Sequence, residues 1–188
     1  MSGNLAVVTD NSIEDLGSLK GKMPSYAKDI KLNLSSVLRE DPASDLTMKQ
    51  IGGIALASAY ATRHADVINA IYGEFADQLD DADIEAAKAA TTIMGMNNVY
   101  YRFVHMVSDD DFGKMPAGLR MNVIGNPGVE KVDFELYSLA VSAINGCGMC
   151  VDSHVQAIAK TGMSNTGIQH SIKIASVLSA AAQALVIS

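Results

Sequence analysis

The sequence predicts an all-α protein without a significant sheet, and three observations carry this prediction. Hydrophobic residues make up 48% of the 188 residues, and they are mainly alanine, isoleucine, leucine and methionine, which favour helices. Aromatic residues, which are enriched in strands, make up only 5%, and tryptophan is absent. No segment alternates apolar and polar residues with the period of a half-buried strand. The length fits a single domain that can bury its own core.

Charge and hydropathy argue against several classes of function. A formal net charge of −7 is unsuited to a nucleic-acid surface, which needs basic residues to replace counterions. The N-terminus lacks the basic and apolar regions of a signal peptide. The most apolar tract, residues 174–187, is too short to span a bilayer and includes Gln183. We therefore expect a soluble, cytoplasmic protein with neither nucleic acid nor a membrane as partner.

Helices are expected where apolar residues recur every three or four positions behind a capping residue. Residues 1–11 lack this pattern and are interpreted as a flexible leader, so that residues 12–188 form the domain. Thr47 and Gln50 have the spacing of a capping box, and the acidic cluster from Asp80 onward suits a helix N-terminus. Helices are predicted over residues 13–23, 24–38, 48–63, 66–79 and 84–106.

The second part of the chain opens with loops and ends with three helices. An acidic loop at residues 108–113 and a turn at residues 125–128 flank the ambiguous segment 119–124. The predicted helices run from Lys131 to Asn145-Gly146, from the C-x-x-C motif to Gly162, and from Ser164 or Asn165 nearly to the C-terminus.

The regions 44–106 and 128–187 are interpreted as related helical halves. A constant displacement pairs Ser58 with Ser142, and it matches a long, a medium and a long helix in both regions. Identities in alanine-rich helices can also arise by chance, so unrelated halves are the alternative.

The stretch from Phe134 to His154 contains the residues with distinctive chemistry. Both cysteines, Cys147 and Cys150, are spaced C-x-x-C, and His154 follows four residues after the second. If the segment after Gly146 is helical, these three side chains lie on one face. A helix N-terminus and a neighbouring imidazole both favour a thiolate, and a C-x-x-C forms a disulfide easily. The pattern is typical of a dithiol that cycles with a disulfide.

Glu135 lies twelve residues before Cys147 on an otherwise apolar face. A carboxylate among apolar neighbours needs a partner, and His154 is the candidate. A single straight helix would rotate Glu135 about 120° away from Cys147, so the two must meet through a bend at Asn145-Gly146. The alternative is a solvated glutamate on the surface.

Two other interpretations of the motif stay open. The cysteines could be small buried hydrophobes, or they could bind zinc together with His154 and Glu135. Structural zinc sites usually draw on two separated pairs of ligands, whereas the other histidines of this chain occur singly. A structural disulfide is a weaker interpretation, because closing a short loop adds little stability. We therefore expect neither a metal nor a cofactor.

A glutamate twelve residues before a C-x-x-C-x-x-x-H motif is present here as Glu135, Cys147, Cys150 and His154. In this pattern the chain resembles the alkyl hydroperoxide reductase D (AhpD-like) family of the carboxymuconolactone decarboxylase-like superfamily. The resemblance extends from about residue 13 to residue 185. The further segments that carry it are residues 26–36, 94–100 and 118–122.

The resemblance implies an all-α fold of repeated helical units, commonly a homotrimer. It implies a thiol-dependent peroxidase and disulfide reductase of antioxidant defence that acts on hydroperoxides. A peroxiredoxin would be its client, and dihydrolipoamide on a lipoylated acyltransferase subunit would supply the electrons. Cys150 would attack the peroxide, Cys147 would supply a proton and close the disulfide, and His154 and Glu135 would relay protons.

Several alternatives remain. Met149 stands between the cysteines where some family members have a histidine, so a proton path through that residue is missing here. The helix start favours Cys147 as the more acidic thiol, whereas the family role and the imidazole favour Cys150. A cofactor-free decarboxylase of the superfamily, or a non-catalytic metal-binding or interaction module, would be the other functions. The apolar tract 174–187 must be buried in the core or against another subunit, which is the sequence argument for a trimer.

Overall fold

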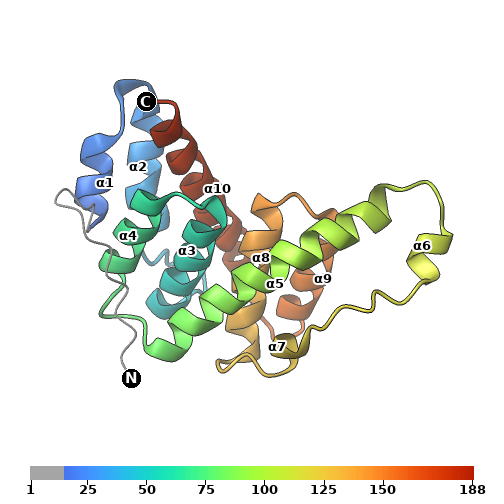
Figure 1. Cartoon of the computed structure of the whole chain (residues 1–188). Helices are drawn as coiled ribbons and strands as arrows, with labels where there is room; N and C mark the ends of the chain where they lie inside the picture. Colours follow the sequence, from blue (N-terminus) through green and yellow to red (C-terminus); the bar gives the residue numbers. More distant parts are fainter. Residues whose placement is uncertain (1–14) are drawn as a thin grey trace, which may run out of the picture.

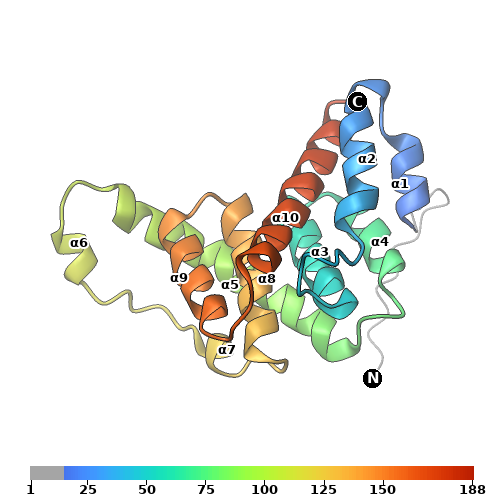
Figure 2. The same cartoon turned by 180° about the vertical axis from the view of Figure 1, so that it is seen from behind.

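The computed structural model describes residues 15–188, and within this range every regular element is a helix (Figures 1 and 2). The all-α class predicted from the sequence is therefore confirmed. The predicted leader, residues 1–11, and the first positions of the helix predicted from residue 13 lie outside the described residues. In the described part, no helix combines the length and the apolar character needed to cross a bilayer.

The first helical elements follow the predicted order, except that the single helix predicted over residues 24–38 is divided into a 3-10 turn and an α-helix. The Asp15 side chain caps the first of them by accepting a hydrogen bond from the Ser18 amide. The capping box predicted from Thr47 and Gln50 is present, and α3 begins at the predicted position. The elements are α1 (Leu16–Lys22), η1 (Ser25–Ala27), α2 (Lys28–Val37), α3 (Met48–Thr62) and α4 (Ala65–Glu74).

Two predicted helix boundaries are wrong. α4 ends at Glu74 rather than at Leu79, because the chain continues as turns that still bury its apolar side chains. α5 (Asp81–Met106) begins before the predicted Ile84, because Asp80 is its N-cap and closes a capping box. The acidic cluster thus forms the first turn of α5 as well as the cap that precedes it.

The segment that follows α5 makes an excursion away from the other helices (Figure 1). It contains two single-turn helices, α6 (Asp111–Lys114) and α7 (Asn122–Gly125). The sequence predicted an acidic loop at the first and left the second ambiguous. A single turn has no apolar period to detect, so pattern analysis misses such elements.

The last three helices follow the predicted order, and both turns between them use glycine. Gly146 has φ of +71° between the first two helices, and Gly162 has φ of +92° after the second. Ser164 then caps the last helix, as predicted. The helices are α8 (Lys131–Ile144), α9 (Gly148–Ala159) and α10 (Asn165–Val186).

The core is centred on α3, which contacts α4, α5, α8 and α10. Residues 51–59 of α3 are buried without interruption. Gly52 and Gly53 let two aromatic rings pack directly on the α3 backbone, because a Cβ atom at either position would overlap Phe75 or Tyr137. This close approach joins the first half of the chain to α8, which carries part of the candidate site.

The chain itself buries most of the apolar tract 174–187. α10 packs against α2, α3 and α8, and Ile174, Leu178 and Ala181 are fully buried. Among the apolar side chains of the tract, the strongly exposed ones are Val186 and Ile187 at its end. Of the two locations that the sequence allowed, the core therefore accounts for the tract, and α10 gives no independent argument for a trimer.

The two halves of the chain show the same order of helix lengths. α3, α4 and α5 have 15, 10 and 26 residues, and α8, α9 and α10 have 14, 12 and 22. The relationship between the halves and the single-domain organisation stay predictions.

Candidate active site at the start of α9

Cys147 and Cys150 lie at the N-terminus of α9 and are joined by a disulfide bond. Cys147 is the N-cap, and its sulfur accepts a hydrogen bond from the Cys150 amide at 3.3 Å. The Cys147 amide donates to the carbonyl oxygen of Ser142, in the last turn of α8, at 3.1 Å. The free amides of a helix N-terminus favour negative charge, so this position suits a thiolate after reduction.

The two cysteines differ in their access to solvent. Cys147 is fully buried, whereas Cys150 is 7% exposed. Met149, which stands between them, is 38% exposed and lies on the surface beside the disulfide. A molecule that approaches from solution therefore reaches Cys150 more readily than Cys147.

The bend between α8 and α9 brings Glu135 and His154 together. Oε2 of Glu135 lies 2.7 Å from Nδ1 of His154, although the two residues belong to different helices. Their side chains are only 12% and 11% exposed. Glu135 is therefore not the solvated surface residue of the alternative interpretation. A carboxylate at this distance accepts the Nδ1 hydrogen and stabilises a positive imidazole.

The second nitrogen of His154 does not face a cysteine. Nε2 lies 3.4 Å from Sδ of Met94, a buried residue of α5. Within residues 15–188, no hydrogen bond joins His154 to either cysteine sulfur. Helical spacing predicted that the imidazole would act on Cys150, but in the disulfide state both ring nitrogens point to α8 and α5 instead.

The contribution of α5 to the site could not be predicted from the sequence. Met94 and Asn98 lie within the segment 94–100 that carried the family resemblance, but no local pattern gave either residue a role. Their position follows from the packing of α5 against α8 and α9. Contacts between helices far apart in the sequence leave no periodic signal, so only the fold reveals them.

The alternative of a metal site finds no ligand set in the described part of the chain. No group of three or more histidine, cysteine, aspartate or glutamate side chains there is arranged to hold a metal ion. In this structure the two cysteine sulfurs form a disulfide, and the His154 ring is hydrogen-bonded to the Glu135 carboxylate.

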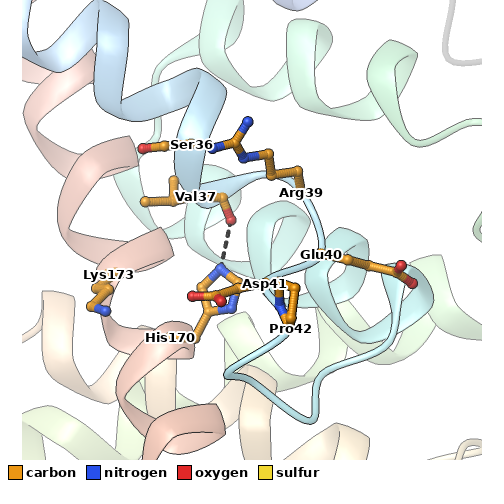
Figure 3. A pocket seen from close by; sticks show the side chains of 8 residues that line it. All are labelled: Ser36, Val37, Arg39, Glu40, Asp41, Pro42, His170 and Lys173. Carbon is orange, nitrogen blue, oxygen red and sulfur yellow. Dashed lines mark hydrogen bonds between the residues drawn. The ribbon is translucent and has the colours of Figure 1, made fainter.

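A cavity of about 450 Å³ lies away from the cysteines, where α2 ends and α10 passes (Figure 3). There His170 is buried and donates from Nε2 to the carbonyl oxygen of Val37 at 2.9 Å. None of the residues around this cavity belongs to α8 or α9. His170 is therefore buried like His154, but its Nε2 bonds to a backbone carbonyl, whereas Nδ1 of His154 meets a carboxylate.

Comparison with known proteins identifies the group to which the chain belongs. The model of the Carboxymuconolactone decarboxylase family matches residues 110–187, which include the C-x-x-C. A protein of Coxiella burnetii (strain RSA 493 / Nine Mile phase I) is 54% identical over 172 residues, covering 92% of this chain and 97% of the relative. A protein of Rhodospirillum centenum is 56% identical over 168 residues, covering 89% of both chains. A protein of Brucella melitensis is 53% identical over 174 residues, covering 93% and 96%.

Each of these three relatives is named alkyl hydroperoxide reductase AhpD. The resemblance found in the sequence motifs is therefore confirmed over almost the whole chain. Since more than half of the aligned residues are identical and the alignments cover about nine tenths of this chain and of each relative, the chain belongs to the AhpD family of the carboxymuconolactone decarboxylase group.

Proposed function

We propose that the protein is a thiol-dependent peroxidase and disulfide reductase that reduces alkyl hydroperoxides. The observation that carries this proposal is the Cys147–Cys150 disulfide at the start of α9, close in the chain to the buried Glu135–His154 pair. A dithiol that closes to a disulfide at a helix N-terminus can accept and release two electrons. The names of the relatives agree with chemistry on peroxides.

In the proposed cycle Cys150 is the attacking thiolate, because it is the more accessible sulfur. The thiolate attacks one oxygen of the hydroperoxide, the O–O bond breaks, and protonation of the departing alkoxide gives the alcohol. Cys150 is then a sulfenic acid. Attack by the thiolate of Cys147 on the Cys150 sulfur releases hydroxide, which leaves as water, and forms the disulfide.

An external dithiol closes the cycle. It transfers two electrons to the disulfide, becomes a disulfide itself, and leaves Cys147 and Cys150 as thiols. Over one turn the hydroperoxide becomes an alcohol and water at the expense of the donor. Neither a metal nor an organic cofactor is required for any of these steps.

Glu135 and His154 supply the proton path in this scheme. A hydrogen bond between a buried carboxylate and an imidazole can hold a proton in one state and release it in another. The position between the cysteines is Met149, which cannot carry a proton. The pair on α8 and α9 is therefore the proposed proton donor to the departing alkoxide.

The proposed partners are a peroxiredoxin as client and a lipoylated acyltransferase subunit as electron source. A lipoyl group at the end of a flexible arm suits a disulfide of which only Cys150 is in part exposed. We also propose a homotrimer in the cytoplasm. These assignments rest on membership of the family. The donor would attack the sulfur of Cys150.

The test is a peroxidase assay of the purified protein with an organic hydroperoxide and three donors in parallel, dihydrolipoamide, thioredoxin and glutathione. We expect turnover with dihydrolipoamide, and its loss in both Cys150→Ser and Cys147→Ser. Ser153→Ala, a change at an exposed position of α9, serves as the matched control and should behave as wild type. Full activity of Cys150→Ser would refute the proposal, and decarboxylation by the double cysteine variant would point to the superfamily's other chemistry.

A further inference from the structure

A row of three residues on α5 faces the candidate site. Met94, Asn98 and Arg102 follow one another at intervals of four, so they share one face of the helix. α5 packs against both α8 and α9, and in Figures 1 and 2 it crosses both helices. All three side chains make their polar contacts with residues that hold or adjoin the disulfide and the Glu135–His154 pair.

Met94 provides the polar atom that contacts Nε2 of His154. The thioether sulfur 3.4 Å from Nε2 can accept a hydrogen bond but cannot donate one. The Glu135 carboxylate on the other nitrogen is also an acceptor. A neutral imidazole has only one hydrogen, so both contacts are satisfied only if the Glu135–His154 pair holds a second proton, either as an imidazolium or on the Glu135 carboxyl that then donates to Nδ1. In both arrangements Nε2 carries a hydrogen, whereas a bare Nε2 would set its lone pair against the sulfur.

Sulfur is also a weak acceptor, and this matters for proton transfer. A hydrogen on Nε2 that faces an oxygen would be held by a strong bond, whereas the thioether holds it loosely. Met94 therefore keeps the hydrogen of His154 in place without competing strongly for it. When a better acceptor such as an alkoxide arrives, the hydrogen can leave.

Asn98 holds the end of α8 and the bend that follows. Its buried side-chain amide donates from Nδ2 to the Ser142 hydroxyl at 2.9 Å. Its Oδ1 accepts a hydrogen bond from the side-chain Nδ2 of Asn145 at 2.9 Å. Nδ2 of Asn98 also lies 3.8 Å from Sδ of Met94, which ties the two residues together. Arg102 adds a hydrogen bond to the Asn145 carbonyl oxygen at 2.8 Å.

The bend held in this way is the part of the chain that positions the redox pair. Ser142, which receives the Asn98 hydrogen bond, accepts the Cys147 amide with its own carbonyl. The direction in which the chain leaves α8 also decides whether Glu135 on α8 can reach His154 on α9. A loosened bend would change both relationships.

We propose that Met94, Asn98 and Arg102 are positioning residues of the redox site. Met94 keeps a transferable hydrogen on Nε2 of His154, while Asn98 and Arg102 fix the bend that carries Cys147. The inference rests on the proposed peroxidase function, because it assigns a purpose to the hydrogen of His154. Its tests nevertheless use readouts that do not depend on peroxidase turnover.

The first test replaces the sulfur of Met94. In Met94→Leu the volume is nearly kept and the acceptor is lost, and Met106→Leu, at an exposed position of the same helix, is the matched control. Nitrogen-15 NMR of the oxidised protein should show the hydrogen of His154 on Nε2 in wild type and control, and a reduced Nε2–H population in Met94→Leu. The kcat should fall by roughly fivefold with an unchanged KM for the hydroperoxide.

The outcomes separate this inference from the proposed function. Unchanged His154 nitrogen signals in a folded Met94→Leu would overturn the role of Met94, whatever the activity of the protein. If wild type proved to have no peroxidase activity, the proposed function would fail while the NMR comparison would still decide what Met94 does.

The second test addresses the bend through an exposed residue whose replacement leaves the core intact. Arg102→Ala removes one hydrogen bond to Asn145, and Arg120→Ala is an exposed arginine control. We expect the equilibrium with a reference dithiol to shift about two- to fivefold toward reduced protein in Arg102→Ala only, because a freer bend favours the open dithiol. Equal equilibria for the two variants and wild type would overturn the role of the bend contacts.

Discussion

Nδ1 of His154 lies 2.7 Å from Oε2 of Glu135, and the two side chains are almost completely buried. The residues belong to α9 and α8, and the glycine turn at residue 146 brings the two helices into position. A buried carboxylate without a partner would be costly, so each residue makes the burial of the other possible. The geometry also explains why a glutamate can stand on the apolar face of α8.

Replacing the carboxylate should affect chemistry more than folding. In Glu135→Gln the size of the side chain is kept, but the negative charge that stabilises the imidazolium is lost. We expect peroxidase turnover to fall by about 10²- to 10⁴-fold, the range of a lost general acid or base. Glu130→Gln, at the exposed N-cap of the same helix, is the control. Turnover of Glu135→Gln close to that of the control would exclude a role for the carboxylate in the proton path.

The exposure of the cysteines predicts which thiol reacts first with a bulky reagent. After reduction, Cys150 should be alkylated faster than Cys147, because Cys147 is fully buried at the N-cap of α9. Limited alkylation followed by peptide mass mapping measures the ratio, and the single variants Cys147→Ser and Cys150→Ser give the reference rates. Preferential labelling of Cys147 would show that the helix start decides reactivity, and it would assign the attack on peroxide to that residue.

The close approach of α3 and α8 can be tested at Gly53. A Cβ atom there would overlap the side chain of Tyr137, which is fully buried. Gly53→Ala should lower the free energy of unfolding by about 1–3 kcal/mol or more, as overpacking of a core does. Gly95→Ala on α5, where the added methyl group meets nothing within 4 Å, should instead be neutral or stabilising. Urea unfolding of both variants makes the comparison, and equal effects would contradict the packing described here.

Asp133 provides a prediction about pH. Burial raises the pKa of its carboxyl above the usual range, while the hydrogen bond from Gln50 and the charge of Lys49 act in the opposite direction. A group whose pKa is raised on folding destabilises the folded state as the pH rises through that pKa, because the buried group must then ionise. Asp133→Asn, which can still accept from Gln50, should therefore gain stability over wild type as the pH rises.

Urea unfolding at about pH 4 and about pH 7 measures this difference. Asp77→Asn, at an exposed position in a turn, is the control for general charge effects. A stability difference between Asp133→Asn and wild type that is the same at both pH values, or that shrinks as the pH rises, would show that ionisation of Asp133 carries no cost.

The features that the sequence predicts here are those encoded by neighbouring residues. The capping box of Thr47 and the cap of Ser164 are local hydrogen-bond patterns, and both were found. Gly146 is expected to end the helix before the C-x-x-C, because few other residues adopt a positive φ, and its φ is positive in the structure. The cost of burying a carboxylate made His154 the candidate partner of Glu135, and the two side chains do meet across that turn.

The orientation of His154 could not be predicted in the same way. Spacing on α9 placed its ring near Cys150, whereas the packing of α5 against α9 presents Met94 to its outer nitrogen. The orientation of His154 therefore depends on a partner sixty residues away in the sequence. The start of α5 was set at Ile84, although the acidic cluster from Asp80 onward was correctly assigned to a helix N-terminus and forms the cap and first turn of α5.

The central claim is that Cys147 and Cys150 gain and lose electrons as one pair during peroxide reduction. The most direct measurement reduces the protein fully, removes the donor, adds one equivalent of an organic hydroperoxide without air, and counts thiols and alcohol. We predict the loss of two thiols for each molecule of alcohol formed, with the mass of the protein lower by two hydrogens. Alcohol formed while both thiols persist, or no alcohol at all from the reduced protein, would contradict the account.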